Sequence, residues 1–283
     1  LILTFLLFYR YSLRSNDEYS FDLRGVKPTP LAYISSIVMI SLSVLGPLLF
    51  NSDGNNTVSM LAILMVAIVP TFFFRGGKLG DIVILYSSAL SILFVTSLAS
   101  SNVSGMDIQT EYFYANNVIQ EYYIDITSDI QYSTVLSTQG IVALLSLWTG
   151  VSLTYVLKVI YPILFSYCAV LLYCSYCRIF NDGVSFYATL VTIFGVAFNT
   201  VMMDAVRQGF SELFMLSTIL IMCSSDDLRM HRNRVFLVPF LISMTLSHYG
   251  INYILYPVFW AAYFLFITFN AVRPFDYDDE LRT

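Results

Sequence analysis

Long apolar runs separated by short polar stretches make up most of this chain. A helix needs about 20 mostly apolar residues to cross a bilayer. Eight runs are predicted to do so, at residues 31–50, 58–74, 82–101, 153–177, 184–203, 209–223, 235–249 and 251–270. A shorter apolar stretch at 1–9 is interpreted as the end of a spanning helix whose start is missing. The chain is therefore expected to be a fragment at both ends.

The composition agrees with this pattern. Of the 283 residues, 57% are hydrophobic and only 12% are charged, against roughly a quarter in a soluble domain. A soluble fold of this length cannot hide so much apolar surface. The net charge of −5 argues against a nucleic-acid partner. The predicted fold class is an all-α, polytopic transmembrane helix bundle, and the partner that this implies is the lipid bilayer.

Cationic residues indicate the orientation of the spans. When the spans alternate, twelve of the 14 Lys and Arg residues fall on one side of the membrane, which the positive-inside rule makes the cytoplasm. These are Arg10, Arg14, Arg24, Lys27, Arg75, Lys78, Arg178, Arg229, Arg232, Arg234, Arg273 and Arg282. The remaining two, Lys158 and Arg207, fall at the outer ends of spans. The predicted location is the plasma membrane, with the acidic loop 102–140 outside.

The same pattern divides the chain into three parts. Residues 1–81 form accessory transmembrane helices, residues 82–270 a transmembrane core, and residues 271–283 a cytoplasmic tail. The outer loop 102–140 is rich in Tyr and acidic residues, and it is expected to lie along the membrane surface as short amphipathic helices. The stretch 141–148 suits a helix at the interface. A transporter would show charges or broken helices at the membrane midplane, and the sequence predicts neither.

Two carboxylates in the outer loop are the first candidate for chemistry. Asp107 and Glu111 are four residues apart, so a helix would place them on one face. Such a pair suits a general base with an orienting partner, or a divalent metal site. The alternative is a pair of solvated loop carboxylates. No cofactor is implied beyond that possible metal ion.

Three further groups lie at the outer ends of spans. Lys158 is either an ammonium that snorkels to the interface or a contact to an anionic lipid head group. Arg207 has the forked geometry that suits phosphate, although a local bridge to Asp204 or Glu212 is an alternative. His248 is either a site residue or an interfacial hydrogen bonder. Together these groups are typical of a site for an anionic, membrane-tethered substrate.

The ordered series of segments 105–111, 132–137 and 158–166, then Arg207-Gln208 with Glu212, then residues 247–249, resembles a known family. That family consists of uncharacterised, mainly archaeal multi-pass membrane proteins. It is similar in turn to the GT-C glycosyltransferases of the protein-mannosyltransferase type. The resemblance covers roughly residues 82–270.

The resemblance implies an inverting glycosyltransferase that moves a sugar from a polyprenyl-phosphate carrier to an acceptor on the outer face. Asp107 would be the base and Glu111 the second acid. Lys158 and Arg207 would hold the carrier phosphate, with His248 donating a further hydrogen bond. The supporting residues would be Glu212 and Tyr249.

Two departures from the family leave the acceptor open: three spans are expected before the matched region, and the 283 residues include no large soluble domain after it. The alternative function is a non-catalytic membrane scaffold, or a subunit of a membrane complex, that retains this fold.

Overall fold

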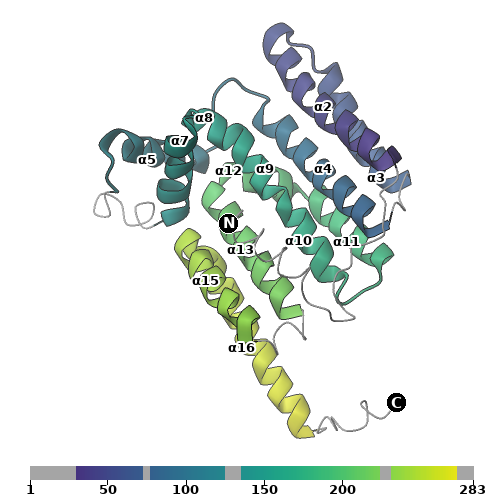
Figure 1. Ribbon diagram of the computed structural model, residues 1–283, viewed down its shortest axis with the longest axis vertical. Helices are drawn as coiled ribbons and strands as arrows, with labels where there is room; N and C mark the ends of the chain where they lie inside the picture. Colours follow the sequence, from purple (N-terminus) through teal and green to yellow (C-terminus); the bar gives the residue numbers. More distant parts are fainter. Residues whose placement is uncertain (1–29, 73–76, 125–134, 224–230, 273–283) are drawn as a thin grey trace.

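A computed structural model describes residues 30–72, 77–124, 135–223 and 231–272, and every regular element in these ranges is helical (Figure 1). The elements are α2 (Pro30–Asp53), α3 (Thr57–Phe72), α4 (Gly77–Ser97), α5 (Asp107–Glu121), η1 (Ser137–Val142), α7 (Ala143–Thr149), α8 (Leu153–Tyr155), η2 (Val156–Ile160), α9 (Tyr161–Phe165), α10 (Tyr167–Tyr176), α11 (Asp182–Phe194), η3 (Ala197–Val201), α12 (Met202–Asp204), α13 (Val206–Cys223), α15 (His231–Ser247) and α16 (Tyr249–Val272), where η marks π-helical turns. The predicted stretch 1–9 and nearly all of the tail 271–283 lie outside the described residues.

The apolar runs of the sequence coincide with these helices. Four segments are long and apolar enough to cross a membrane: Pro30–Asp53, Gly77–Ser97, Leu153–Tyr176 and Val206–Cys223. The pair Asp182–Phe194 and Ala197–Asp204 makes a fifth if it is one span, while Thr57–Thr71 and Val235–Ser247 are shorter apolar helices. The predicted all-helical class is therefore confirmed, and the helices fit a membrane protein. The number of eight crossings stays a prediction.

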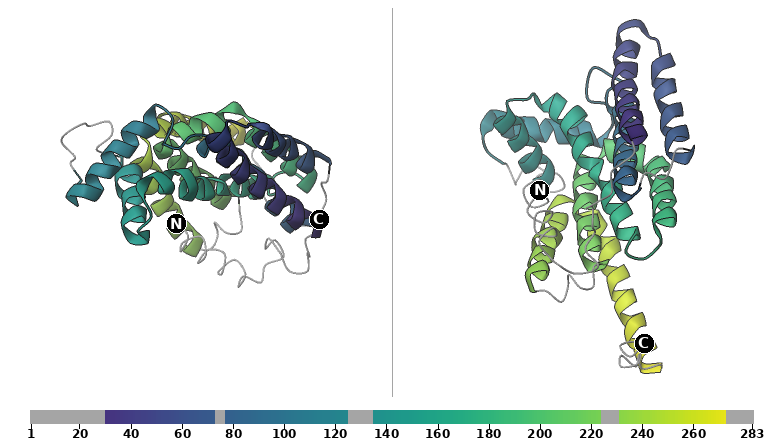
Figure 2. Two further views of the ribbon diagram at one scale, coloured as in Figure 1. Left: turned by 90° about the horizontal axis from the view of Figure 1, so that it is seen from above. Right: turned by 45° about the vertical axis from the view of Figure 1, so that its right-hand side comes forward.

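The helices form a bundle with a smaller group at one end. In Figure 1, α2 and α3 lie at one edge, α15 and α16 lie at the other, and α4, α9, α10, α11 and α13 fill the middle. Both views of Figure 2 show α5 and α7 beside the bundle rather than within it. The largest fully buried side chains include Tyr161, Phe165, Tyr173 and Phe186. All four belong to α9, α10 and α11, so the core lies in the middle layer.

A close approach between α13 and α9 fixes the start of α13. A Cβ atom at Gly209 would overlap the hydroxyl of Tyr161, so only glycine allows this spacing. That hydroxyl is buried and donates a 2.6 Å hydrogen bond to the carbonyl of Met202 in α12. The first turns of α13 are therefore held against both α9 and α12.

One predicted span is broken, which corrects the expectation that no helix is interrupted. The run 184–203 is α11 followed by η3 and α12, with a bend of 58° between the two parts. Gly195 ends α11 in an extended conformation, with φ −62° and ψ 140°. A single glycine in an apolar run is a weak signal of a break, which is why the sequence did not reveal it. The bend directs η3 and α12 toward α5.

Ion pairs lie at both ends of the bundle. At one end Lys78 and Asp182 approach to 3.4 Å and join the starts of α4 and α11. Near the same end, the buried hydroxyl of Tyr173 donates to Asp81 at 3.1 Å. At the other end Arg207, in the first turn of α13, reaches Asp107 of α5. The first end is the predicted cytoplasmic side and the second the predicted outer side.

Candidate functional site

The two loop acids lie on one helix, α5, but in different environments. Helix α5 begins at Asp107, whose side chain is 42% exposed. Glu111 follows one turn later and is only 2% exposed. Its Oε2 accepts a hydrogen bond from the backbone N–H of Val206 at 2.9 Å, and its Oε1 accepts from that of Arg207 at 3.4 Å. Glu111 is therefore no solvated loop carboxylate.

These contacts make Glu111 a helix cap supplied from another element. The residue before α13 is Ala205, whose carbonyl accepts from Gln208 and Gly209 and so begins the helix. Alanine has no side-chain acceptor for the free N–H groups of the first turn, where Ser, Thr, Asp or Asn is preferred. The carboxylate of Glu111 takes that part instead. The acidic helix α5 and the start of α13 are thereby joined into one unit.

Arg207 completes the cluster by pairing with both acids of α5. Its Nη2 lies 2.7 Å from Asp107 Oδ2, and its Nε lies 3.5 Å from Glu111 Oε1. The guanidinium side chain is only 10% exposed. The sequence suggested a local bridge to Asp204 or Glu212 as an alternative, but the described ion pairs of Arg207 cross to α5. Glu212 instead accepts from the side chain of Gln208 at 3.3 Å.

Burial sets the charge of this cluster. Burial raises the pKa of Glu111 to about 8, against the opposing effects of the Arg207 guanidinium and the two backbone N–H groups. Glu111 therefore keeps its proton to a higher pH than a solvated carboxyl would, and Arg207 makes its shorter ion pair with Asp107. Among the described residues, Oδ1 of Asp107 contacts no hydrogen-bond donor. Asp107 is therefore the acid of the cluster that an incoming hydroxyl group can reach.

The geometry does not favour a metal ion at the two acids. Both oxygens of Glu111 already accept N–H hydrogen bonds, and Arg207 occupies one oxygen of Asp107. Within the described part of the chain, no three His, Cys, Asp or Glu side chains are grouped so that they could hold a metal. The donor set does not fit a divalent cation, so no chemical step is assigned to one.

His248 lies between α15 and α16, close to the same cluster. Its Nδ1 accepts from the backbone N–H of Ile251 at 3.3 Å, so it caps α16 and carries its proton on Nε2. Its ring stacks on Tyr249 with centroids 5.4 Å apart. Burial lowers the pKa of His248, and the charge of Arg207 lowers it further, while Asp107 acts in the opposite direction. His248 is therefore a neutral hydrogen-bond donor beside the acids.

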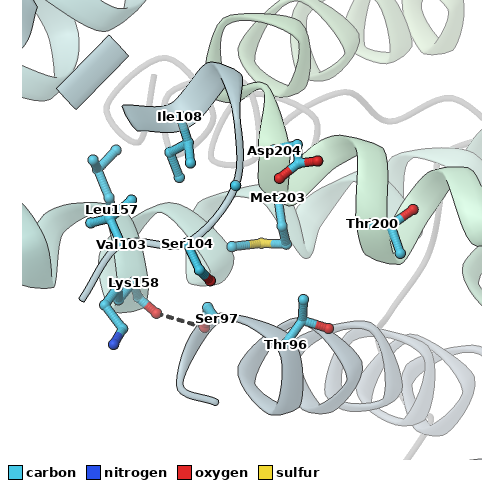
Figure 3. A pocket seen from close by; sticks show the side chains of 11 residues that line it. Thr96, Ser97, Val103, Ser104, Ile108, Leu157, Lys158, Thr200, Met203 and Asp204 are labelled. Carbon is cyan, nitrogen blue, oxygen red and sulfur yellow. Dashed lines mark hydrogen bonds between the residues drawn. The ribbon is translucent and has the colours of Figure 1, made fainter. Parts of the chain in front are cut away.

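Lys158 lies in the π-helical turn η2, in the wall of a neighbouring cavity of about 270 Å³ (Figure 3). The residue is 7% exposed, and its ammonium donates to the carbonyl of Ser100. Among the described residues it has no acidic partner. Gly105 and Ile108, which flank Asp107 in the sequence, line the same cavity. Lys158 is thus a buried cation in the wall of a cavity whose lining includes sequence neighbours of Asp107 but not Asp107 itself.

The loop before α5 closes the cavity against α12. Gly105 has a φ of +136°, a conformation that side chains with a Cβ rarely adopt. A Cβ there would also overlap Oδ1 of Asp204. Two independent constraints therefore require glycine at this position, and they hold the start of α5 directly against Asp204.

The structure brings together Asp107, Glu111 and Arg207, with His248 and Tyr249 nearby. It does not place Lys158 and Arg207 around one shared site. Lys158 lines the cavity, whereas Arg207 contacts the two acids and does not line it. Sequence reasoning did not single out the cavity-lining residues Ser97, Ser104, Thr200 and Met203. Ser, Thr and Met are common in membrane proteins, and only the fold gathers these four residues around one cavity.

Comparison with known proteins adds no family to this description. No family model matches the chain, and no curated protein or solved structure matches it. The likeness to GT-C glycosyltransferases stays a prediction from the sequence.

Proposed function

We propose that this protein is a membrane glycosyltransferase, which moves a sugar from a polyprenyl-phosphate carrier to an acceptor on the outer face. The observation that carries the proposal is the buried ammonium of Lys158, which has one carbonyl acceptor and no acidic partner among the described residues. A buried charge without a counter-ion costs several kcal/mol. A phosphate at the rim of the cavity would supply that counter-ion.

The acid cluster supports the second half of the reaction. In the proposed step, the oxygen of an acceptor hydroxyl forms a bond to the anomeric carbon of the sugar. The bond from that carbon to the phosphate oxygen breaks, and its electron pair stays on the polyprenyl phosphate. The hydroxyl proton moves to Oδ1 of Asp107, the oxygen that Arg207 leaves accessible.

The neighbouring residues have distinct roles in this proposal. Lys158 stabilises the negative charge that grows on the leaving phosphate. Arg207 and Glu111 orient Asp107 by fixing helix α5 against the start of α13. His248 offers a neutral N–H donor to the same region. An eight-span GT-C-like topology, with the acidic loop outside, belongs to the proposal as well.

The test uses purified protein in nanodiscs and a radiolabelled hexose on a short-chain polyprenyl phosphate, with membrane extract as the source of acceptor. The measured quantity is the release of label from the carrier, by transfer or by hydrolysis. Asp107→Asn keeps the shape of the side chain and removes its basicity, so release should fall by about two to four orders of magnitude. Asp53→Asn, at an exposed acid near the end of α2, is the matched control and should behave as wild type.

Carrier binding separates the roles of Asp107 and Lys158. Lys158→Met should weaken binding of bare polyprenyl phosphate by ~1.5–3 kcal/mol, the range for a hydrogen bond to a charged group, while Asp107→Asn should leave it unchanged. Carrier binding without release of any hexose by the wild type would refute the enzyme. The non-catalytic scaffold would then be the better account.

A further inference from the structure

The lining of the cavity beside Lys158 is rich in hydroxyl groups. Thr96 and Ser97 of α4, Ser104 of the loop and Thr200 of η3 bring four hydroxyls to its lining. In Figure 3, Lys158 lies on one side of the cavity, and Asp204 and Thr200 lie on the other. Val103, Ile108, Leu157 and Met203 supply apolar surface between them.

Most of these hydroxyls present only lone pairs to a ligand. Thr96 donates its proton to the carbonyl of Ile92 at 3.2 Å, and Ser97 donates to that of Lys158 at 2.9 Å. Thr200 donates to the carbonyl of Val196 at 2.7 Å. Three hydroxyl oxygens therefore remain as acceptors. A cavity with this lining favours a ligand rich in hydrogen-bond donors.

Asp204 adds the strongest acceptor. Within the described ranges its carboxylate has neither a hydrogen-bond donor nor a cation as partner, although Gly105 packs directly against it. Lys158 and Asp204 thus carry opposite charges on opposite sides of one cavity without neutralising each other. A ligand that complements both has an anionic group at one end and hydroxyl donors at the other.

We infer that the cavity binds the hydroxylated head group of the donor, and that Asp204 is a specificity-determining residue that accepts hydrogen bonds from the sugar hydroxyls. The phosphate then lies at the Lys158 rim and the sugar extends toward Asp204, with its anomeric carbon beside the start of α5. This inference rests on the proposed function, because it assigns a place to the sugar of the same donor.

The test compares two ligands in nanodiscs: bare short-chain polyprenyl phosphate and the same carrier bearing a hexose. The wild type should bind the hexosyl carrier about tenfold tighter or more, the gain expected from a charge-assisted hydrogen bond. Asp204→Asn should bind the bare carrier like the wild type and lose that gain. Asp53→Asn should keep it, because that exposed acid does not line the cavity.

A series of deoxyhexoses on the carrier sharpens the test. Removing the sugar hydroxyl that Asp204 binds should weaken binding of the hexosyl carrier to the wild type by a similar factor. The same removal should not weaken binding to Asp204→Asn. The exposed, unpartnered side chain makes this variant safe for folding. If it fails to fold nevertheless, the series on the wild type decides alone, and equal affinity for every deoxyhexose overturns the inference.

The outcomes separate the inference from the proposed function. Equal binding of the two carriers by the wild type, or a retained gain in Asp204→Asn, overturns the inference and leaves the proposed function in place. Failure of the wild type to bind either carrier overturns both. Hexose 1-phosphate, which has no polyprenyl tail, is the last probe. If it displaces the carrier at a similar concentration, the ligand is a soluble sugar phosphate, and the assignment to a membrane-borne donor is overturned.

Discussion

Replacing Glu111 by glutamine should remove a specific pH dependence from the stability of this protein. Burial raises the pKa of Glu111 from its ordinary value of 4.5 to about 8. The folded chain therefore holds a proton that the unfolded chain releases between these values. The resulting stability is complete below pH 4.5 and is lost as the pH rises through 8. The slope is at most about 1.4 kcal/mol per pH unit for one proton.

The cost of losing the cap is a separate effect, and it follows from the contacts of Glu111. Glu111→Ala leaves the buried N–H groups of Val206 and Arg207 without an acceptor, and it removes one of the two acidic side chains that contact the guanidinium. Losing this cap leaves buried N–H donors unsatisfied, which costs about 1–3 kcal/mol. We expect a loss of that size at pH 6. Glu111→Gln keeps one acceptor and should cost less.

Thermal unfolding in detergent micelles, followed by intrinsic fluorescence between pH 5 and 9, measures both effects. Glu121→Gln is the matched control, since this exposed acid ends the same helix. Other groups that titrate in this window, such as His248, cancel when variant and wild type are subtracted. Parallel pH profiles for wild type and Glu111→Gln would show that Glu111 does not titrate there. Unchanged stability of Glu111→Ala would refute the cap itself.

Two further predictions concern packing and topology. Gly209→Ala places a methyl group on the Tyr161 hydroxyl and should destabilise the protein by ~1–3 kcal/mol. The control in the same unfolding assay is Gly80→Ala, whose Cβ would meet only Ala32 at 3.9 Å. Equal stability of the two variants would contradict the tight contact between Gly209 and Tyr161. A cysteine introduced at the exposed Gln120 should react with an impermeant thiol reagent added from outside the cell. A cysteine introduced at the exposed Ile179 should react only after the membrane is permeabilised. Labelling of the unmodified chain is the baseline for both, and the reverse pattern would refute the predicted orientation.

The positions of the helices were predictable from the sequence, but the ion-pair and hydrogen-bond partners of the site residues were not. Apolar runs of the right length are a direct requirement of a bilayer, so the helical class and most helix positions followed from them. The outer loop was also expected to form short helices, and α5 is one such helix. The partners of Arg207 were not predictable, because it meets the acids of α5 about 100 residues earlier in the chain. Only the fold brings such distant segments together.

Backbone groups account for much of what the sequence could not show. The burial of Glu111 is explained by the hydrogen bonds that its two carboxyl oxygens accept from N–H groups in the first turn of α13. A sequence does not show which backbone N–H groups need such a partner. The clue that was present is negative: Ala205 stands where a capping side chain is usual. In the same way, the break at Gly195 depends on one conformation within an apolar run that reads as continuous.

The π-helical turn η2 makes the position of Lys158 depend on the length of the chain as well as on its residues. A π turn holds one residue more than the α-helical turn it replaces. Deleting a single residue of the turn, such as Ile160, would let the segment return to α-helix with the flanking helices α8 and α9 still in phase. Lys158, which lies inside the turn, would then change its direction around the helix axis and its ammonium would leave the cavity, although no site residue had changed. Among homologous sequences, single-residue gaps in this turn would therefore mark a loss of the anion site that no comparison of residue identities detects.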